Sequence, residues 1–346
     1  MKPKVLVGMS GGVDSSVCAA LLQNDGFEVV GVTLNLFGDT EKAQGDAKAV
    51  CDTLGIQHAV FDLQNEFKQF VIDDFINEYI AGRTPNPCLV CNRKIKFGEM
   101  LKIADKLGCQ KIATGHYAKI IEKDGRFLLC RAEDRAKDQS YVLYCLNQEQ
   151  LSRTVLPLSS HSKDAVRKTA EEYSLVNADK KDSQDICFVP DGDYAAFIER
   201  TANFVSEGGN YLDINGKVLG QHKGVIRYTI GQRKGLGIAL GKPAFVIDKN
   251  PVTNEVIIGD EEHLFYKRVY VENLNFIPFD ELKGEMKVHC KLRYRHSEQP
   301  AVIKPYKNGV LVEFNDPQRA PSPGQAAVFY DGDIVVGGGT IVCGIE

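Results

Sequence analysis

A glycine-rich turn between an apolar strand and a helix is the feature that most constrains the fold. Lys4–Gly8 predicts a strand, Asp14–Asn24 predicts a helix, and residues 9–13 join them. Glycine lets a backbone turn tightly around an anion, and a helix N-terminus directs unpaired N–H groups at a phosphate. The turn has neither the Gly-Lys-Ser/Thr ending of a Walker A loop nor the Rossmann glycine spacing. We therefore predict a phosphate-binding loop of another kind, formed by Gly8, Met9, Ser10, Gly11, Gly12, Val13, Asp14, Ser15 and Ser16.

The residues after this turn predict an α/β fold with a parallel sheet. Apolar runs at Glu28–Leu36, around His58–Phe61 and at Lys111–Thr114 alternate with amphipathic helical stretches. After residue 203, glycines and short alternating strands dominate. We expect a catalytic domain over 1–203, a small β-rich central linking domain over 204–272 and a C-terminal β-barrel of about six strands over 273–346.

The composition is that of an ordinary globular protein and excludes several classes. Of 346 residues, 43% are hydrophobic and 25% are charged, a balance unlike that of disordered or fibrous chains. No apolar run reaches the ~18–20 residues of a membrane span, and the residues after Met1 show no secretory pattern. We expect a cytoplasmic protein with no membrane partner. The net charge of −4 argues against a nucleic-acid coat protein but leaves local basic patches open.

Further motifs, taken in order, resemble one enzyme family over essentially the whole chain. The loop at residues 10–16 matches the pyrophosphatase loop (PP-loop) of ATP-cleaving α-hydrolases, which split ATP into AMP and pyrophosphate. The motifs that narrow the match are Gly82-Arg83-Thr84-Pro85-Asn86-Pro87, Cys91-Asn92, Ile95-Lys96-Phe97, Ala113-Thr114-Gly115-His116-Tyr117, Lys137-Asp138-Gln139-Ser140-Tyr141, Asp182-Ser183-Gln184, Ile186-Cys187-Phe188 and Tyr228-Thr229-Ile230-Gly231-Gln232-Arg233-Lys234-Gly235-Leu236. Together they are similar to the tRNA-uridine 2-sulfurtransferase (tRNA 2-thiouridylase) family. The resemblance implies an adenine-nucleotide α-hydrolase-like domain and ATP-dependent 2-thiolation of the wobble uridine of tRNA.

Exchange of a carbonyl oxygen for sulfur has two chemical requirements. The oxygen must become a leaving group, which happens when uridine O2 attacks the α-phosphate of ATP and pyrophosphate departs. The phosphate loop would hold the phosphates, with Mg²⁺ neutralising their charge. A sulfur nucleophile must then attack the same carbon. If the sulfur arrives as a persulfide, one cysteine carries it and a second cleaves the S–S bond by thiol exchange.

Cys91 and Cys187 are the candidates for these two cysteines. Cys91 follows a Pro-rich turn, is expected at a helix N-terminus, and has Arg93, Lys94 and Lys96 nearby in sequence, features that lower the pKa of a thiol from its usual ~8.5. Cys187 lies in a polar stretch between predicted elements. By the resemblance, Cys187 receives the persulfide and Cys91 is the nucleophile that frees the sulfur.

Cys88 departs from the pattern of the family, in which many members carry an acidic residue at this position. The change creates a Cys-x-x-Cys pair with Cys91. The pair is compatible with redox chemistry, or with half of a zinc site, although no second Cys-x-x-Cys completes four ligands. Alternatively, Cys88, Cys91 and Cys187 would bind three irons of a [4Fe–4S] cluster whose fourth iron binds sulfide. Cys88 without a chemical role is the remaining possibility.

The resemblance also implies contacts with ATP and tRNA. Leu34 and Gly115 would contact ATP. Contacts with tRNA would involve Ile95, Lys96, Phe97, His116, Lys137, Asp138, Gln139, Tyr294, Arg295 and Gln325, with an extruded uridine near Ile95–Phe97. From the residues alone, His116 is equally compatible with a structural role. Asp14 could be a catalytic acid, a Mg²⁺ ligand or the helix N-cap, and its place within the loop favours a role in the site.

Two basic stretches are candidate nucleic-acid contacts. Residues 214–247 contain no acidic residue but six basic ones, Lys217, Lys223, Arg227, Arg233, Lys234 and Lys242. Period-2 alternation places a second set on one strand face, namely Lys287, His289, Lys291, Arg293 and Arg295. A solvated strand face is the alternative. The family's partners would be tRNAs with Lys, Glu and Gln acceptors and a protein that donates persulfide sulfur.

Two other functions are compatible with a pyrophosphatase loop. An amide-forming ligase that acts on a small molecule, such as GMP synthetase or argininosuccinate synthetase, would need neither Cys91, Cys187 nor the basic strand face. A non-catalytic sulfur or Fe–S carrier would bind nucleotide only as a structural ligand and would produce no AMP.

Overall fold

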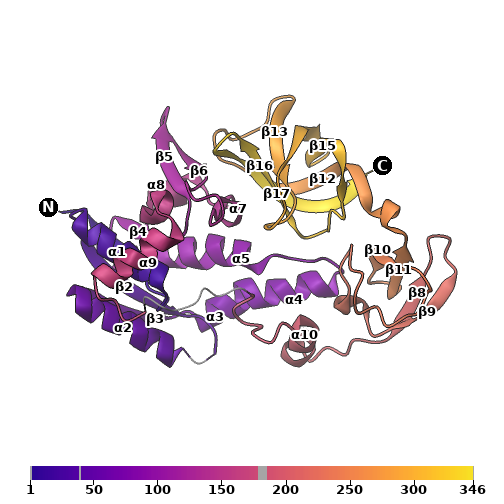
Figure 1. Cartoon of the computed structure of the whole chain (residues 1–346), viewed down its shortest axis with the longest axis horizontal. Coiled ribbons are helices and arrows are strands. Elements are labelled where there is room, and N and C mark those ends of the chain that lie inside the picture. The colour runs from indigo at the N-terminus through magenta and orange to yellow at the C-terminus, as the bar shows by residue number, and fades with distance from the viewer. Residues whose placement is uncertain (1, 39, 178–184, 346) are drawn as a thin grey trace. The chain divides into compact units, whose positions relative to one another are not determined.

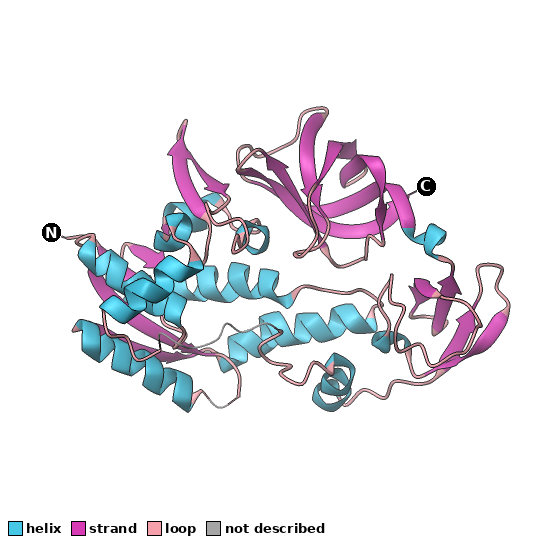
Figure 2. Ribbon diagram, in the orientation of Figure 1, coloured by secondary structure: helices cyan, strands magenta, loops and turns pink. Residues whose placement is uncertain are grey.

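The computed structural model describes residues 2–38, 40–177 and 185–345, which form two compact units. The first contains Met1–Val71, Cys88–Phe188 and Gly332–Gly337, and the second contains Ile72–Pro87, Val189–Asp331 and Gly338–Glu346. Figure 1 labels their helices and strands, and Figure 2 shows that helices and strands alternate in the first unit whereas strands dominate the C-terminal part.

A five-stranded parallel sheet forms the centre of the first unit. Its strand order is β3-β2-β1-β4-β7, with bounds β1 Lys4–Gly8, β2 Glu28–Asn35, β3 Gln57–Asp62, β4 Lys111–Ala113 and β7 Thr154–Val155. The apolar runs of the sequence predicted four of these strands and their parallel pairing. The central strand β1 is buried because helices cover the faces of the sheet, and Val5 and Val7 of β1 pack in one core with Val13, Val17 and Leu22 of the first helix.

The helices of this unit connect the strands as the alternation predicts. The long ones are α1 (Val13–Asn24), α2 (Glu41–Leu54) and α9 (Lys163–Glu172), and α1 and α9 lie side by side (Figure 1). Shorter ones are α3 (Gln64–Phe67), η1 (Lys68–Ile72), α7 (Ser140–Leu143), α8 (Gln148–Ser152) and η3 (Pro157–Ser160). A hairpin of β5 (Lys119–Lys123) and β6 (Arg126–Cys130) turns at Asp124-Gly125, as predicted.

One helix contains a π-helical segment beside the site. The helix consists of three consecutive elements, α5 (Pro87–Val90), the π-helical η2 (Cys91–Glu99) and α6 (Met100–Lys106). It therefore begins before Cys91. Widening of a helix leaves carbonyl groups without their usual i+4 donors. The buried Gln150 amide supplies donors by bonding the carbonyl oxygens of Arg93 and Phe97, both at 2.8 Å.

The second unit combines helices, a small sheet and a barrel. The helices are α4 (Asp73–Ile80) and α10 (Tyr194–Ala202), and the sheet has the order β10-β11-β8-β9, with bounds β8 Gly209–Leu212, β9 Val218–His222, β10 Phe245–Asn250 and β11 Glu255–Gly259. Short helices η4 (Val225–Arg227) and η5 (Glu261–Leu264) flank the sheet strands.

The barrel is closed by six strands among the described residues. Their order is β12-β15-β14-β13-β16-β17, and β17 also pairs with β12. Their bounds are β12 Phe265–Phe276, β13 Met286–Lys291, β14 Gln299–Tyr306, β15 Gly309–Arg319, β16 Ala326–Asp331 and β17 Ile334–Ile345. The barrel therefore starts at Phe265, inside the range 204–272 that the sequence assigned to the central domain, because β12 continues through the predicted boundary.

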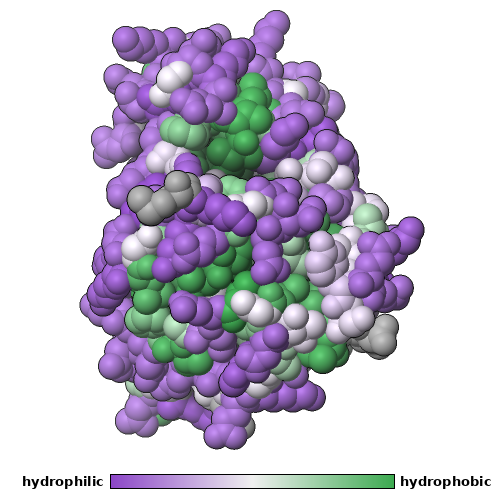
Figure 3. Space-filling model, turned by 90° about the vertical axis from the view of Figure 1, so that its left-hand side faces the viewer, coloured by the Kyte–Doolittle hydropathy of each residue, from purple (hydrophilic) through white to green (hydrophobic). Residues whose placement is uncertain are grey.

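The next feature is the length and hydropathy of the helices. None of the described helices is both long and apolar enough to cross a bilayer. On the face shown in Figure 3, apolar side chains gather in patches that hydrophilic side chains separate.

Candidate functional site

The carboxyl ends of three neighbouring strands bring the predicted residues together in the first unit. The phosphate loop follows β1, Leu34 lies near the end of β2, and Gly115 and His116 follow β4. Ligands of open parallel sheets bind at this edge. A cavity of about 250 Å³ lies here, lined by Gly8, Met9, Ser10, Asp14, Ser15, Val32, Leu34, Leu36, Lys96, Met100, Thr114, Gly115, His116 and Gln139.

Hydrogen bonds within the chain fix the shape of the phosphate loop. The Ser15 and Ser16 hydroxyls each donate to the Gly12 carbonyl at 3.0 Å, and the Ser10 amide donates to Ser15 Oγ at 3.2 Å. Gly11 adopts a φ of 69°, which favours glycine. Gly12 is the N-cap of α1, so Asp14 lies one residue inside the helix and is not its cap. Gly11, Gly12, Val13 and Ser16 shape the loop without lining the cavity.

The Asp14 carboxylate is bound by two side chains from later in the chain. Lys163 Nζ lies 2.8 and 2.9 Å from its two oxygens, and the Tyr117 hydroxyl donates to Oδ1 at 2.7 Å. Lys163 is buried, with 7% of its surface exposed. A lysine at the first position of a helix opposes the helix dipole, and its ion pair with Asp14 offsets that cost.

The buried Asn177 amide braces the other side of the loop. Its Nδ2 donates to Gly11 O at 3.1 Å and to Ser16 Oγ at 2.9 Å. No sequence motif points to Lys163 or Asn177, because only the tertiary fold brings them to the loop. Lysine at the start of a helix, directly after the Ser162 cap, was the one local signal that Lys163 has an acidic partner.

Gly115 permits the close approach of the β4 end to the phosphate loop. A Cβ at this position would lie 2.7 Å from the Asp14 carbonyl carbon, 2.8 Å from the Ser15 nitrogen and 2.9 Å from the Asp14 Cβ. The first two are backbone atoms that cannot rotate away. Only glycine fits here without displacing the loop.

His116 is a neutral imidazole at the cavity. Burial lowers its pKa well below the usual 6.5, and the Lys96 charge lowers the pKa further. Its Nδ1 lies 2.8 Å from Thr114 Oγ1, and its ring packs against Phe97 with 5.7 Å between ring centroids. His116 can therefore exchange hydrogen bonds with a ligand but adds no positive charge at neutral pH.

Cys88, Cys91 and Cys187 lie close enough for their charges to interact. The charges of Cys187 and Cys88 raise the pKa of Cys91, and the charge of Cys88 raises that of Cys187. The thiols of Cys88 and Cys187 are exposed, whereas Cys91 is buried. All ten cysteines lie within the described residues, and no disulfide joins any two of them.

The predicted lowering of the Cys91 pKa is wrong for this structure. Burial, the largest effect, raises the pKa of Cys91 to about 11, and Lys96 lowers it only in part. The Lys94 ammonium lies over the Phe70 ring, 5.7 Å from its centroid. The helix starts at Pro87, so Cys91 also lies past its first turn, where the dipole effect fades.

A fourth thiol lies near Cys91. Cys145 follows α7, and its thiol donates to the Leu89 carbonyl at 3.4 Å. Burial, assisted by the Cys91 charge, raises the pKa of Cys145 to about 12. Among the described residues, no three His, Cys, Asp or Glu side chains form a group that could hold a metal ion.

The predicted tRNA contacts of the first unit separate into accessible and enclosed residues. Lys96, His116 and Gln139 line the cavity, whereas Ile95 and Phe97 are fully buried and offer no side-chain surface to a base. Asp138 accepts bonds from the Ala132 amide at 2.9 Å and the Ser140 hydroxyl at 2.7 Å, and so orders the loop that carries Lys137 and Gln139. The motif Asp182-Ser183-Gln184 lies outside the described residues.

The predicted tRNA contacts of the second unit also differ from one another. Tyr294 and Arg295 are exposed. Gln325 is half-buried, and its amide donates to the Thr84 carbonyl at 2.7 Å, which links the Gly82–Pro87 turn to the barrel. The basic strand face is shorter than predicted, because β13 ends at Lys291 and the chain then turns. Only Lys287, His289 and Lys291 share it.

Three family profiles match consecutive parts of the chain. They are the tRNA methyl transferase HUP domain over residues 3–191, the tRNA methyl transferase PRC-barrel domain over 195–260 and the aminomethyltransferase beta-barrel domain over 266–341. These ranges agree with the observed order of parallel sheet, small central β domain and C-terminal barrel.

Full-length relatives are similar to the chain from end to end. A tRNA-specific 2-thiouridylase MnmA of Carboxydothermus hydrogenoformans is 50% identical over 356 aligned residues, which cover 98% of both chains. Proteins of the same description from Clostridium botulinum and Clostridium perfringens are 48% identical, again with 98% of both chains covered.

Substitution of Gly115 by alanine is expected to weaken ATP binding by at least about tenfold, or ~1.4 kcal/mol, because the added methyl group displaces the backbone of the phosphate loop. Titration calorimetry with ATP measures the effect. Gly45→Ala in α2 is the matched control, since a Cβ there meets nothing within 4 Å. A folded G115A protein with unchanged ATP affinity would contradict the role assigned to Gly115.

Alkylation of Cys91 by iodoacetamide is expected to accelerate about tenfold per pH unit between pH 8 and 10 without levelling, since only the thiolate reacts and the pKa of Cys91 is raised to about 11. Peptide mass spectrometry measures the rate. In urea, where Cys91 is exposed, the alkylation rate should stop rising near pH 8.5, the ordinary pKa of a cysteine thiol (~8.5). Levelling near pH 8.5 in the folded protein would show that burial does not control this thiol.

Proposed function

Because the chain belongs to the tRNA-specific 2-thiouridylase family, we propose that it thiolates the wobble uridine of tRNA at C2 with ATP and persulfide sulfur. The uridine would be adenylated at O2, and sulfur carried by Cys187 would replace the oxygen, releasing AMP and pyrophosphate. The observation that carries this proposal is the position of Lys96. It lines the cavity of the phosphate loop and lowers the pKa of both Cys91 and Cys187.

The first step uses the phosphate loop, which Lys163 and Asn177 hold in place. Uridine O2 attacks the α-phosphate, an O–P bond forms, and the bond to pyrophosphate breaks. The backbone of Gly8–Ser10 and the side chains of Ser15 and Lys96 line the cavity that would receive the nucleotide. Preformed donors of this kind stabilise developing charge without reorganisation.

Mg²⁺ would neutralise part of the negative charge on the phosphates during this step. Asp14 is a poor candidate for its ligand, because both carboxylate oxygens are bonded to Lys163 and one also to Tyr117. The ATP phosphates themselves are the better oxygen donors for this ion. The role we assign to Asp14 is therefore to anchor the loop to Lys163 and Tyr117.

The second step uses the two cysteines. The Cys91 thiolate attacks the inner sulfur of a Cys187 persulfide, so that a Cys91–Cys187 disulfide forms and hydrosulfide leaves. The hydrosulfide attacks C2 of the adenylated uridine, the C2–O bond breaks, and the oxygen departs with AMP. A thiol reductant then reduces the disulfide. Lys96 favours the Cys91 thiolate electrostatically, and neutral His116 would exchange hydrogen bonds with the uracil ring.

The partners follow from the same chemistry. The substrate would be a tRNA with a uridine at the wobble position, of the kind that accepts Lys, Glu or Gln, and a second protein would deliver persulfide sulfur to the exposed Cys187. An extruded base reaches the cavity more readily than a stacked one.

Nucleoside mass spectrometry on unmodified tRNA, incubated with ATP-Mg²⁺ and a persulfide donor, tests this function. We expect 2-thiouridine from the wild type and a loss of at least about 100-fold with Cys91→Ser and with Cys187→Ser, while tRNA-dependent AMP formation changes by less than about threefold. Cys343→Ser, in the barrel strand β17, is the control and should keep both activities.

Other results of this assay would indicate a different mechanism or a different function. Product formed only without oxygen and after iron reconstitution, with Cys88→Ser also inactive, would replace the persulfide by a [4Fe–4S] cluster on Cys88, Cys91 and Cys187. AMP formed with a small acid or nucleotide in the absence of tRNA would indicate an amide-forming ligase. Absence of AMP with every substrate would indicate a carrier.

A further inference from the structure

A π-helical segment of nine residues is the unusual element of the first unit. It is η2, Cys91–Glu99, and the Met100 amide that follows it bonds the carbonyl of Ile95, five residues earlier. π-helices are rare, occur mostly as single-turn bulges and lie frequently at functional sites. A segment of this length therefore needs support from outside the helix, and its position beside the cysteines points to a role in the site.

The wider turn changes which side chains share a face of the helix. In an α-helix, at ~3.6 residues per turn, side chains five residues apart point about 140° away from each other. In a π-helix, whose hydrogen bonds join residues five apart, the same two side chains lie nearly one above the other. Cys91 and Lys96 are five residues apart. The π form, unlike the α form, therefore places the thiol and the ammonium group on the same side.

The effects of Lys96 agree with this arrangement. Burial raises the pKa of Cys91, and the Lys96 charge is the largest effect that opposes it. Burial likewise raises the pKa of Cys187, which the Lys96 charge lowers. Lys96 also lines the cavity of the phosphate loop. One ammonium group thus influences both cysteines and lines the cavity where the nucleotide would bind.

The Cys91 end of the segment is fixed to a neighbouring helix. Asn92 is buried, and its Nδ2 donates to the Val142 carbonyl of α7 at 2.9 Å. The Cys145 thiol donates to the same carbonyl at 3.7 Å. Because this end is held, the direction of Lys96 depends on how widely the helix turns between residues 91 and 96.

Gln150 supplies the donors that the widened turn needs. Its Nε2 donates to the carbonyl oxygens of Arg93 and Phe97, both at 2.8 Å. Its Oε1 accepts from the Asn147 amide at 3.0 Å, and its own amide donates to Asn147 Oδ1 at 2.8 Å. Its carbonyl accepts from the Thr154 hydroxyl at 2.7 Å. Since every polar group of the buried Gln150 is bonded, its side chain cannot turn away from the helix without losing hydrogen bonds.

A glycine leaves room for one of these carbonyls. A Cβ at residue 98 would lie 3.0 Å from the Arg93 oxygen, which is the atom that accepts from Gln150. Gly98 lies five residues after Arg93, the spacing of a π-helical turn. Gly98 and Gln150 therefore favour the same position of the Arg93 carbonyl.

We propose that Gln150 is a positioning residue that keeps this helix in its π form and so holds Lys96 on the same side as Cys91. It acts through the carbonyls of Arg93 and Phe97 and does not itself line the cavity. The inference rests on the proposed function for its consequence in catalysis, whereas the position of Lys96 relative to Cys91 can be tested without tRNA.

A double-mutant cycle on the reactivity of Cys91 tests the inference. Lys96→Met removes the ammonium group and should slow alkylation of Cys91 by iodoacetamide about tenfold at about pH 9, which corresponds to one pKa unit. Gln150→Met keeps the length of the side chain and removes both donors. In the Q150M protein, Lys96→Met should slow alkylation by less than about twofold, because Lys96 no longer faces the thiol. Peptide mass spectrometry measures the rates.

Asn147→Ala is the matched control for Gln150→Met. It removes the side-chain cap of α8 but keeps the Gln150 donors and the backbone amide that Gln150 Oε1 accepts from. In this background Lys96→Met should keep its effect of about tenfold.

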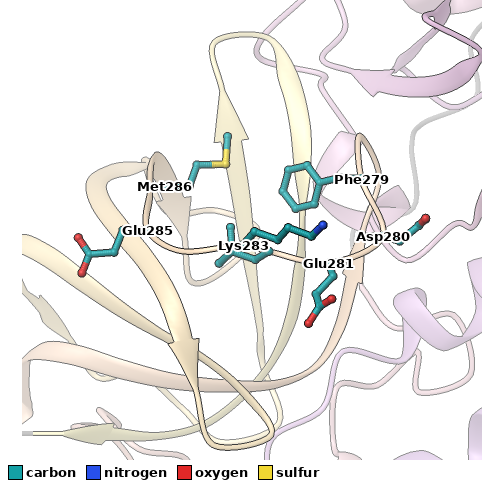
Figure 4. A pocket seen from close by; sticks show the side chains of 7 residues that line it. Phe279, Asp280, Glu281, Lys283, Glu285 and Met286 are labelled. Atoms are coloured by element: carbon teal, nitrogen blue, oxygen red, sulfur yellow. The ribbon is translucent and has the colours of Figure 1, made fainter.

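Lys283→Met controls for the loss of one positive charge. Lys283 lines a cavity of about 630 Å³ in the second unit, together with residues 279–282, 285 and 286 (Figure 4). This cavity shares no residue with the cavity of the phosphate loop. The alkylation rate of Cys91 in Lys283→Met should therefore equal that of the wild type.

Formation of 2-thiouridine gives a second readout. At saturating tRNA and ATP, Gln150→Met should lower the rate of 2-thiouridine formation about tenfold or more, whereas Asn147→Ala should change it by less than about threefold. Thermal melting checks that each variant is folded. If Q150M does not fold, Gly98→Ala takes its place in the cycle, because the added Cβ would displace the Arg93 oxygen from Gln150.

Three results would overturn the inference. A folded Q150M protein in which Lys96→Met still slows alkylation about tenfold would show that Gln150 does not set the position of Lys96. Loss of the Lys96 effect in N147A would show that any weakening of α8 is sufficient. Absence of the effect in the wild type would show that Lys96 does not act on Cys91. Failure of the wild type to form 2-thiouridine is a separate result, which would remove the proposed function but leave the alkylation comparison intact.

Discussion

The ion pair between Asp14 and Lys163 is the interaction on which the site depends. Asp14 belongs to the phosphate loop, and Lys163 opens the helix that packs on α1, so the pair locks the loop to a distant part of the chain. Tyr117 adds a second bond from the end of β4. Removing one partner of a largely buried pair leaves an uncompensated charge. A loop fixed in this way can receive phosphates without first becoming ordered.

Burial has the largest effect on the ionisation of Cys91 in the same region. It raises the pKa of Cys91 to about 11, so this thiol is mainly protonated at neutral pH, and Lys96 offsets only part of this effect. A protonated thiol is a weak nucleophile and oxidises slowly. The attack that we propose for Cys91 would therefore be favoured by an arrangement in which its thiol is less buried or closer to Lys96.

Local patterns predicted much of the fold and part of the site. Apolar runs located β1, β2, β3 and β4, and the glycine-rich turn located the phosphate loop, because both signals lie within a few residues. Lys163 and Asn177 were missed because only the packing of α9 against α1 brings them to the loop. The Cys91 pKa was predicted with the wrong sign, since sequence shows neighbouring charges but not burial. Arg293 was misplaced because period-2 alternation does not reveal that β13 ends at Lys291.

The most direct test of the account follows the oxygen that leaves uracil. A tRNA whose wobble uridine carries ¹⁸O at O2 would be incubated with the enzyme, ATP-Mg²⁺ and a persulfide donor, and the released AMP analysed by mass spectrometry. Adenylation at O2 predicts one ¹⁸O in AMP for every 2-thiouridine formed. Appearance of ¹⁸O in water or pyrophosphate, with unlabelled AMP, would contradict it.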